Sequence, residues 1–228
     1  MGKETVFELK KRTKELEKLV KLQEIEIREL SALSERDILT ELYNRRGFIR
    51  EAEKFLKEVK ALRSIPEKRK ISFKDFSVVF IDLDNLKIIN NEYGHKAGDK
   101  ALKMAAEIFR NSVRDIDIVA RWGGDEFVIG LAGTDEKTAF AIAEELKAKL
   151  KTLKIKSQRM SASFGIVSYH HKNKSPRLAT GYSKKHKAKE KVLNQLYQLI
   201  EKADMTMYEA KKGKGKDSIV VYNDKTDI

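Results

Sequence analysis

The stretch from Val113 to Phe127, which reads VRDIDIVARWGGDEF, constrains the fold of this chain more than any other segment. Apolar residues dominate from Ile116 to Ala120, and a second apolar run extends from Phe127 to Leu131. Two glycines lie between the runs. Because paired glycines accept the positive φ of a tight turn, the pattern predicts two strands joined as a β-hairpin.

Two carboxylates, Asp125 and Glu126, follow the glycines directly and therefore lie at the tip of this hairpin. Carboxylates beside a backbone that no side chain covers can hold a hard cation and the phosphates it bridges. A solvated acidic turn is the alternative interpretation. The run Gly123–Phe127 also resembles the signature of the GGDEF domains, the diguanylate cyclases that join two GTP molecules into cyclic di-GMP.

Composition limits the class of protein. The chain has 228 residues, 41% hydrophobic content and two prolines, which suits one core of ordinary domain size. It has no cysteine, so disulfides and thiolate metal sites are excluded. No apolar run is long enough to span a membrane, and we expect a soluble, cytoplasmic protein. The net charge of +13 requires an anionic partner, either nucleic acid or a nucleotide triphosphate.

The N-terminal region predicts one long helix from about Val6 to Asp37. Apolar positions recur at spacings of three and four, interrupted by two polar residues, in a heptad seam: Val6, Leu9, Thr13, Leu16, Val20, Gln23, Ile27 and Leu30. We expect residues 1–36 to form a coiled-coil signalling helix through which the chain makes a homodimer. A single amphipathic helix packed on its own domain is the alternative.

A second motif runs from Asp37 to Phe48 and reads DILTELYNRRGF. By itself it indicates a break followed by an amphipathic helix to about Lys60, and Ser64 to Lys74 then forms a basic loop. The motif resembles the D-x-L-T-x-L-x-N-R-R sequence with which GGDEF domains begin. We therefore assign residues 37–228 to a cyclase domain.

The segment from Phe76 to Leu83 predicts a buried strand, because its apolar run is continuous. It ends in Asp82-Leu83-Asp84. An unpaired buried carboxylate is costly, so a cation is the expected partner of Asp82. For Asp84 we expect a cap on the short helix that runs to Tyr93 and is closed by Gly94.

The residues from Asp82 to Asp99 resemble the family sequence D-x-D-x-F-K-x-I-N-D-x-x-G-H-x-x-G-D, with Leu86 and Asn91 as departures. The resemblance implies that Asp82 and the Leu83 carbonyl hold Mg²⁺. It further implies a phosphate contact and two guanine contacts, made respectively by Lys87, Asn90 and Asp99. An aspartate accepts from the ring N–H and amino group of guanine, which adenine would leave unpaired. An N-cap on a helix from Lys100 to Ser112 is the alternative role for Asp99.

Arg114 and Asp117 form an R-x-x-D motif just before the hairpin turn. In the family this motif forms an inhibitory site for the product, and the resemblance implies allosteric cyclic di-GMP binding here. Arginine can grip a phosphate or a guanine edge, and the carboxylate can accept from the base. An ordinary surface ion pair at a helix-to-strand corner is the alternative.

The same resemblance implies one catalytic centre. Asp125 and Glu126 act as catalytic residues and join Asp82 around Mg²⁺, with Mn²⁺ as an alternative metal. Gly123 and Gly124 contact the substrate. The bound metal would polarise the α-phosphate, and a second metal or a carboxylate would help to deprotonate the 3′-hydroxyl.

Downstream, periodicity predicts a helix from Asp135 to Leu153, a strand from Arg159 to Tyr169 and a helix from Val192 to Lys212. Between them, His170 to Lys191 is strongly basic, and we interpret it as an inserted loop, with a docking surface for an anionic partner as the alternative. A last strand runs from Ser218 to Tyr222.

The final predicted helix contains ADMTMYEAK, which begins at Ala203 and resembles the family's A-D-x-A-M-Y-x-A-K. The resemblance implies that Lys211 contacts phosphate. The glycine and lysine pattern that follows is shifted by about one residue. Lys214 or Lys216 is therefore the alternative phosphate contact.

These patterns predict an α/β (α+β) domain with a mostly antiparallel, five-stranded central sheet flanked by helices, similar to the nucleotidyl-cyclase palm. The expected function is a diguanylate cyclase that holds one GTP in each half of a dimer and receives its input from an upstream or separate sensor. A catalytically silent module that senses GTP or cyclic di-GMP is the alternative. A nucleic-acid-binding coiled-coil protein, suggested by charge alone, is disfavoured because it gives the acids no role.

Overall fold

The computed structural model describes residues 2–33, 35–61, 75–170, 182–213 and 215–223. It divides into two compact units, Met1–Glu35 and Arg36–Ile228, which we treat separately. The predicted basic loop from Ser64 to Lys74 lies outside the described residues, and so do residues 171–181 of the predicted insertion.

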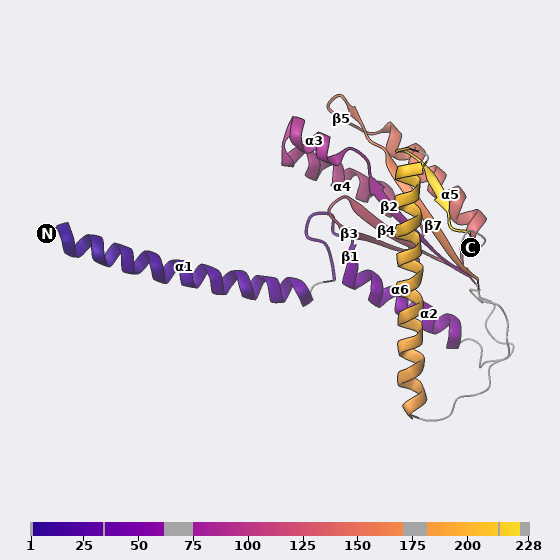
Figure 1. Cartoon of the computed structure of the whole chain (residues 1–228), viewed down its shortest axis with the longest axis horizontal. Coiled ribbons are helices and arrows are strands. Elements are labelled where there is room, and N and C mark those ends of the chain that lie inside the picture. Colours follow the sequence, from indigo (N-terminus) through magenta and orange to yellow (C-terminus); the bar gives the residue numbers. More distant parts are fainter. Residues whose placement is uncertain (1, 34, 62–74, 171–181, 214, 224–228) are drawn as a thin grey trace. The chain divides into compact units, whose positions relative to one another are not determined.

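The first unit is the single helix α1 (Gly2–Leu33), drawn as one continuous coil in Figure 1. It confirms the predicted long helix, although it ends before Asp37. The apolar side chains of α1 whose burial is described find no cover within the unit and are more than half exposed: Leu9, Leu16, Leu19, Val20, Leu22 and Leu30. An apolar seam of this kind requires a partner surface to leave water.

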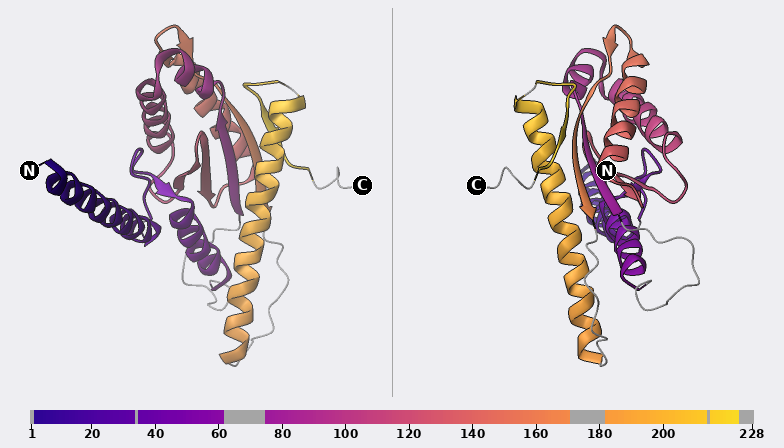
Figure 2. Two further views of the ribbon diagram at one scale, coloured as in Figure 1. Left: turned by 60° about the vertical axis from the view of Figure 1, so that its left-hand side comes forward. Right: turned by 90° about the vertical axis from the view of Figure 1, so that its right-hand side faces the viewer.

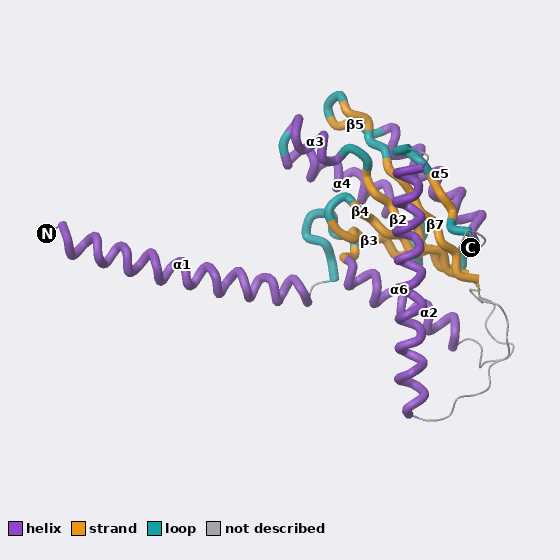
Figure 3. Tube along the Cα trace, in the orientation of Figure 1, coloured by secondary structure: helices purple, strands orange, loops and turns teal. Residues whose placement is uncertain are grey.

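The second unit is built on a six-stranded sheet, seen as the orange strands of Figure 3. Its strands are, in spatial order, β1 (Tyr43–Asn44), β3 (Ile118–Gly123), β4 (Glu126–Ala132), β2 (Asp75–Leu83), β7 (Ala162–His170) and β8 (Ile219–Val221). The four central strands are antiparallel, and the short outer strands pair in parallel with their neighbours. The expected mostly antiparallel sheet is confirmed, with the two-residue β1 as an additional edge strand.

Helices cover both faces of this sheet, as the two views of Figure 2 show. Three helices pack on one face: α3 (Leu86–Tyr93), α4 (His95–Asn111) and α5 (Glu136–Thr152). Two pack on the other: α2 (Arg45–Ala61) and α6 (Tyr182–Gly213). Along β2, Val79 and Ile81 enter the first core, whereas Val78 and Phe80 enter the second. Because both faces are buried, the strand is apolar throughout its length, as predicted.

Two helices of the second unit begin five or more residues before their predicted starts. Helix α4 begins at His95, so Asp99 lies inside it and the alternative role of Asp99 as an N-cap is wrong. Gly94, with φ of 80°, forms the junction, and its N–H donates to the Asn90 carbonyl at 2.9 Å. The positive φ of Gly94 ends α3 and lets α4 start at the next residue. Asp99 resembles a helix N-cap in the sequence, and for that reason the start of α4 was predicted too late.

Helix α6 begins at Tyr182, ten residues before the predicted start at Val192. The part of the predicted insertion from 182 to 191 is therefore helical, not a loop. Five of its ten residues are lysine, which favours helix without needing an apolar face. A small hairpin of β5 (Lys154–Ile155) and β6 (Gln158–Arg159) leads into β7.

Candidate active site

The predicted hairpin forms between β3 and β4, and its turn contains Gly124 and Asp125. Gly124 has φ of 52°, in the left-handed region that favours glycine. The pairing shifts by one residue between Arg121 and Gly123, which makes Trp122 a β-bulge. A bulge redirects a side chain, and Trp122 packs edge-on against Phe48 at 6.0 Å between ring centroids. The Trp122 side chain therefore anchors β3 to the core, while Gly123 and Gly124 at the turn stay exposed.

The sheet register brings the predicted acids together at one end of the sheet. Asp82, at the end of β2, is the pairing partner of Glu126 at the start of β4. The Leu83 N–H donates to the Asp125 carbonyl at 3.0 Å. Asp82 is 7% exposed, whereas Asp125 and Glu126 are half-buried. Segments more than 40 residues apart in sequence thus place three carboxylates around one exposed turn.

The electrostatics of this cluster favour a cation. Burial raises the pKa of Asp82, and the charge of Asp125 also raises it, against a lowering effect from Lys211. Burial likewise raises the pKa of Glu126, and the largest contribution from a charge comes from Asp204. Burial raises the pKa of Asp204 as well. Raised values mean that these carboxylates lack enough positive charge to compensate their burial and mutual repulsion.

Asp204, on α6, was not among the predicted site residues. In the sequence it lies in the same motif as Lys211, and this proximity was the signal that could have identified it as a site residue. On α6, Asp204 and Lys211 are seven residues apart, or nearly two turns, and therefore share one face of the helix. This face adds a fourth carboxylate to the cluster.

Lys211 makes the closest contact in the cluster. Its Nζ lies 2.5 Å from Asp82 Oδ1, an ion pair between α6 and the end of β2. Oδ1 is buried, and within the described residues no hydrogen bond of good geometry reaches it besides this ion pair. The alternative phosphate contact Lys216 lies nearby as well, because its Nζ donates to Asn85 Oδ1 at 2.6 Å. Lys214 is outside the described residues.

Asp84 has a different role from the predicted helix cap. Its carboxylate accepts from Ser161 Oγ at 2.9 Å, from Ser163 Oγ at 3.1 Å and from the Asp217 N–H at 2.9 Å. It is 4% exposed. The predicted cap is wrong because Asn85 precedes α3 instead, without a capping side-chain hydrogen bond. Asp84 ties the loop after β2 to β7 and to the segment after α6, so it organises the site without being free for a ligand.

The predicted guanine contacts lie on the hairpin of α3 and α4. Asn90 is half-buried on α3, and a Cβ added to Gly98 on α4 would overlap its side-chain amide. Asp99 follows Gly98 and is exposed. Lys87 is exposed in the first turn of α3. Gly98 therefore lets the two helices approach closely enough to bring Asn90 beside the turn of α4 that carries Asp99.

Arg121, which the sequence interpretation did not single out, connects the glycine turn of the hairpin to the start of the domain. Its Nε and Nη2 donate to the Gly124 carbonyl at 3.0 and 2.8 Å. Its Nη1 lies 3.2 Å from Asp37 Oδ1, and Asp37 in turn accepts from the Thr40 N–H and hydroxyl. These Thr40 hydrogen bonds and Arg121 outweigh burial and lower the pKa of Asp37. The first residues of the domain thereby hold the turn in place.

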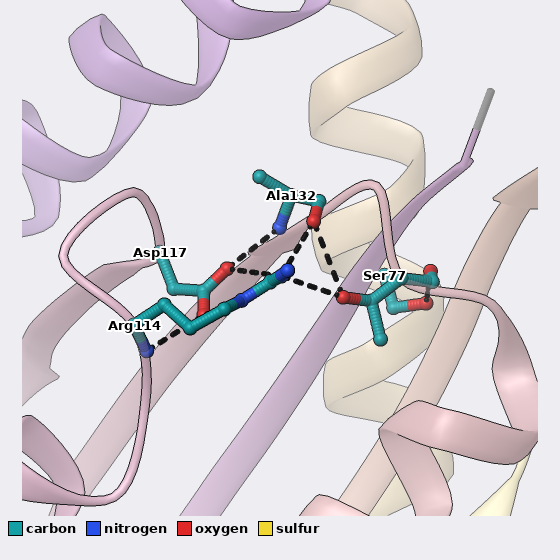
Figure 4. A network of polar contacts seen from close by, with 5 residues as sticks. Ser77, Arg114, Asp117 and Ala132 are labelled. Carbon is teal, nitrogen blue, oxygen red and sulfur yellow. Dashed lines mark hydrogen bonds and ion pairs between the residues drawn. The ribbon is translucent and has the colours of Figure 1, made fainter. Parts of the chain in front are cut away.

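The predicted product site, Arg114 and Asp117, forms a closed network (Figure 4). Arg114 donates to Asp117 from its backbone N–H, Nε and Nη2, at 3.0, 3.1 and 3.0 Å. Asp117 also accepts from the Ala132 N–H at 2.9 Å, and its side chain is 1% exposed. The structure thus shows the ion pair that was the alternative interpretation, although the carboxylate is buried, not superficial.

Arg114 nevertheless keeps an exposed edge, because its side chain is 55% exposed. It contributes to the wall of a pocket of about 580 Å³ together with Ser112, Thr134, Thr138 and Ile142. The pocket lies between the loop before β3 and the start of α5. A ligand in it would meet the guanidinium, whereas the Asp117 carboxylate is already occupied by Arg114 and Ala132; Asp75 and Asp135 also line the pocket.

The carboxylate cluster suits a metal that is shared with a nucleotide. In the described part of the chain, no three carboxylate or imidazole side chains form a ready-made metal site. Mg²⁺ bound with a nucleotide needs only one or two carboxylates, because phosphates and water complete its coordination. The buried oxygen of Asp82, for which Lys211 is the only partner among the described residues, fits such a metal.

Known proteins resemble this chain over most of its length. The profile of the family "Diguanylate cyclase, GGDEF domain" matches residues 34–188. A diguanylate cyclase of Vibrio cholerae is 28% identical over 204 residues, which are 89% of this chain and 54% of that protein. The chain therefore spans about half the length of that relative.

Two solved structures share the fold. The GGDEF domain of TpbB or YfiN from Pseudomonas aeruginosa is 30% identical, with a TM-score of 0.61, and the match covers 82% of this chain and 94% of that one. The coiled coil and GGDEF domain of DgcB from Caulobacter crescentus, solved with c-di-GMP, matches with a TM-score of 0.63 at 18% identity. That match covers 94% of this chain and 99% of the other. None of the described helices is long and apolar enough to cross a membrane.

Proposed function

Because this chain belongs to the GGDEF family of diguanylate cyclases, we propose that it condenses two molecules of GTP into cyclic di-GMP and releases two pyrophosphates. The observation that carries the proposal is the cluster of Asp82, Asp125 and Glu126 around an exposed glycine turn. Burial raises the pKa of Asp82 and of Glu126, and carboxylates with this property are suited to a metal-bound nucleotide.

Each part of GTP has a place in this proposal. Asp82 and Glu126, with the Leu83 carbonyl and Asp125, would hold Mg²⁺ or Mn²⁺, which polarises the α-phosphate and neutralises charge on the departing pyrophosphate. Lys211 and Lys216 would contact phosphates, as would Lys87. Asn90 and Asp99 would read the guanine edge. The exposed backbone of Gly123 and Gly124 would let the substrate approach closely.

In the reaction, the 3′-hydroxyl oxygen of one GTP attacks the α-phosphorus of the other. The bond from that phosphorus to the bridging oxygen of pyrophosphate breaks, and the hydroxyl proton passes to a carboxylate of the Asp125–Glu126 pair. The same step in the opposite direction closes the ring. One domain holds one GTP, so two domains must face each other.

The helix α1 would supply this proximity by forming a parallel coiled coil with a second copy. Its exposed Leu9, Leu16 and Leu30 are separated by seven and fourteen residues, which are one and two heptads, as a coiled-coil seam requires. A dimeric stalk raises the effective concentration of one domain at the other. We further propose that an upstream or separate sensor controls how the two domains meet.

Product inhibition would use the pocket beside Arg114. Cyclic di-GMP would contact the exposed edge of the guanidinium, and Asp117 would hold that guanidinium in position. A catalytically silent module that binds GTP or cyclic di-GMP is the alternative function. It would keep binding at both places but show no turnover.

The test is to incubate the full chain with GTP and Mg²⁺ and to resolve the nucleotides by chromatography. We expect cyclic di-GMP from the wild type, none from Asp125→Ala, and wild-type amounts from Glu145→Ala, which removes an exposed carboxylate on α5. Retained GTP binding without product, after any bound product is stripped, would favour the silent module. Equal product from wild type and Asp125→Ala would contradict the proposed centre.

A further inference from the structure

The ion pair between Lys211 and Asp82 has a consequence for how the site accepts metal. Asp82 Oδ1 is buried at the end of β2, and the Lys211 ammonium lies 2.5 Å from it. Mg²⁺ binds carboxylate oxygens at about 2.0–2.1 Å and usually retains several waters. A cation with this requirement and an ammonium at hydrogen-bond distance compete for the same oxygen, because like charges repel strongly in a half-buried site.

Lys211 differs in this respect from the other lysines that the structure describes near the end of α6. Lys212 lies over the ring of Tyr208, with its Nζ 4.5 Å from the ring centroid. Lys216 donates to Asn85. The charge of Lys211, by contrast, lowers the pKa of both Asp82 and Glu126. Of these three lysines, Lys211 is the one that acts as counter-ion to the carboxylate cluster.

We propose that Lys211 is a built-in counter-ion that must leave Asp82 before a divalent cation can bind there. The proposal depends on the proposed function only for the identity of the nucleotide. When metal arrives alone, the displaced ammonium loses its carboxylate and gains nothing. When metal arrives with a nucleotide, the phosphates offer the ammonium a new partner. Metal and nucleotide therefore bind with positive coupling, and metal alone binds weakly.

The test is a titration of nucleotide-free full-length protein with Mn²⁺, in which electron paramagnetic resonance measures the free ion. Lys211→Met removes the competing charge and should tighten Mn²⁺ binding on the order of tenfold, the factor that corresponds to about 1.4 kcal/mol. Lys212→Met is the matched control and should leave binding unchanged. The gain should vanish when Asp82→Asn is added to Lys211→Met, because the freed oxygen is then gone.

Mn²⁺ affinity that is equal in wild type and Lys211→Met, with both proteins folded by circular dichroism, would overturn the inference. If Lys211→Met does not fold, the wild type itself provides the readout, through ¹⁵N-resolved NMR of its lysine ammonium groups. We expect the Lys211 ammonium signal, protected by its ion pair, to shift on Mg²⁺ addition. A signal that does not respond would also overturn the inference.

The outcomes separate this inference from the proposed function. Tighter Mn²⁺ binding by Lys211→Met, combined with no cyclic di-GMP from the wild type, would keep the inference and reject the cyclase. Turnover by the wild type, combined with unchanged Mn²⁺ binding by Lys211→Met, would reject the inference and keep the cyclase. Lys211→Met should also lose turnover if its ammonium serves the phosphates, so turnover of this variant decides nothing about the competition.

Discussion

Two buried aspartates of this domain, Asp82 and Asp117, have opposite surroundings. Asp117 accepts from Arg114 and from the Ala132 N–H, so that both of its oxygens are satisfied by the fold. Asp82 has a buried oxygen with an ammonium as its one described partner, and Asp125 nearby adds repulsion. The difference supports our proposal that the chain uses Asp117 for its own stability and Asp82 for a ligand.

The same contrast extends to the regions around them. The corner of Arg114 and Asp117 joins the loop before β3 to the end of β4 in a closed network (Figure 4). The proposed catalytic end of the sheet instead gathers four carboxylates whose mutual repulsion the fold tolerates. Sites that are built for a charged ligand commonly cost stability in the ligand-free protein. Substitutions in the two regions should therefore affect activity and stability in opposite patterns.

The largest effect is expected for activity at the proposed catalytic end of the sheet. Glu126→Gln removes a proposed metal ligand while keeping the shape of the side chain, and we expect cyclase turnover to fall by roughly 10³-fold or more. Circular dichroism and gel filtration should show an intact fold. A variant that retains more than about a tenth of wild-type turnover would break the comparison, because Glu126 would then be an ordinary acid of the strand.

The next effect is on stability at the corner. Asp117→Asn removes charge from a buried acceptor of the Arg114 guanidinium and the Ala132 N–H, and should lower the free energy of unfolding by roughly 2 kcal/mol. Urea denaturation measures this change. Asp115→Asn, two residues away and fully exposed, is the matched control and should have almost no effect. A stability of Asp117→Asn equal to that of the control would show that the network contributes nothing.

A smaller effect is expected for Arg121, which connects the glycine turn to the start of the domain. Arg121→Lys keeps the charge but cannot donate to Gly124 and Asp37 together, so it should cost about 1 kcal/mol of stability. Turnover should fall several-fold because the glycine turn is less fixed. Arg159→Lys, on the exposed β6, serves as the control. Loss of stability without any loss of turnover would limit Arg121 to a structural role.

The smallest effect is the pH dependence of stability. The pKa of Glu126 is raised in the folded protein. At a pH between the ordinary and the raised pKa, Glu126 is therefore protonated in the folded state and ionised in the unfolded state. Stability therefore falls as pH rises through that window, and Glu126→Gln should remove this slope. Urea midpoints across the acidic pH range measure it.

Asp135 provides the control for this slope, because its pKa is shifted in the opposite direction. Hydrogen bonds from Thr138 lower the pKa of the exposed Asp135 at the N-terminus of α5. Its stabilising contribution is lost as pH falls through the lowered value, so Asp135→Asn should remove a slope of the opposite direction. A Glu126 variant that behaves like the Asp135 variant would contradict the assigned shift.

The sequence was sufficient for the parts of the site that follow from local pattern. Gly123 and Gly124 predicted the hairpin, and the apolar run before Asp82 predicted a buried strand that delivers its carboxylate to the same end. The partners of those residues depend on long-range packing, which local pattern does not encode. Asp84 was misread as a cap because its partners, Ser161, Ser163 and Asp217, lie more than 70 residues away.

Other features escaped prediction for similar reasons. The bulge at Trp122 arises from strand register, which a single strand does not reveal. Arg121 bonds to Asp37, which is 84 residues away in the sequence, and to Gly124 across the hairpin turn. Local pattern predicts neither bond. Helix α6 was predicted too short because its first ten residues carry helix propensity without an apolar stripe.

The most direct test of the contrast between the two aspartates is the gain in unfolding free energy on adding Mg²⁺ and a non-hydrolysable GTP analogue. A ligand that binds only the folded state stabilises it in proportion to its affinity. Asp117→Asn should start lower than the wild type and gain as much as the wild type does. Asp82→Asn should start near the wild-type value and gain almost nothing. A full gain in Asp82→Asn, or a large initial loss of stability in that variant, would contradict the reserved role of Asp82.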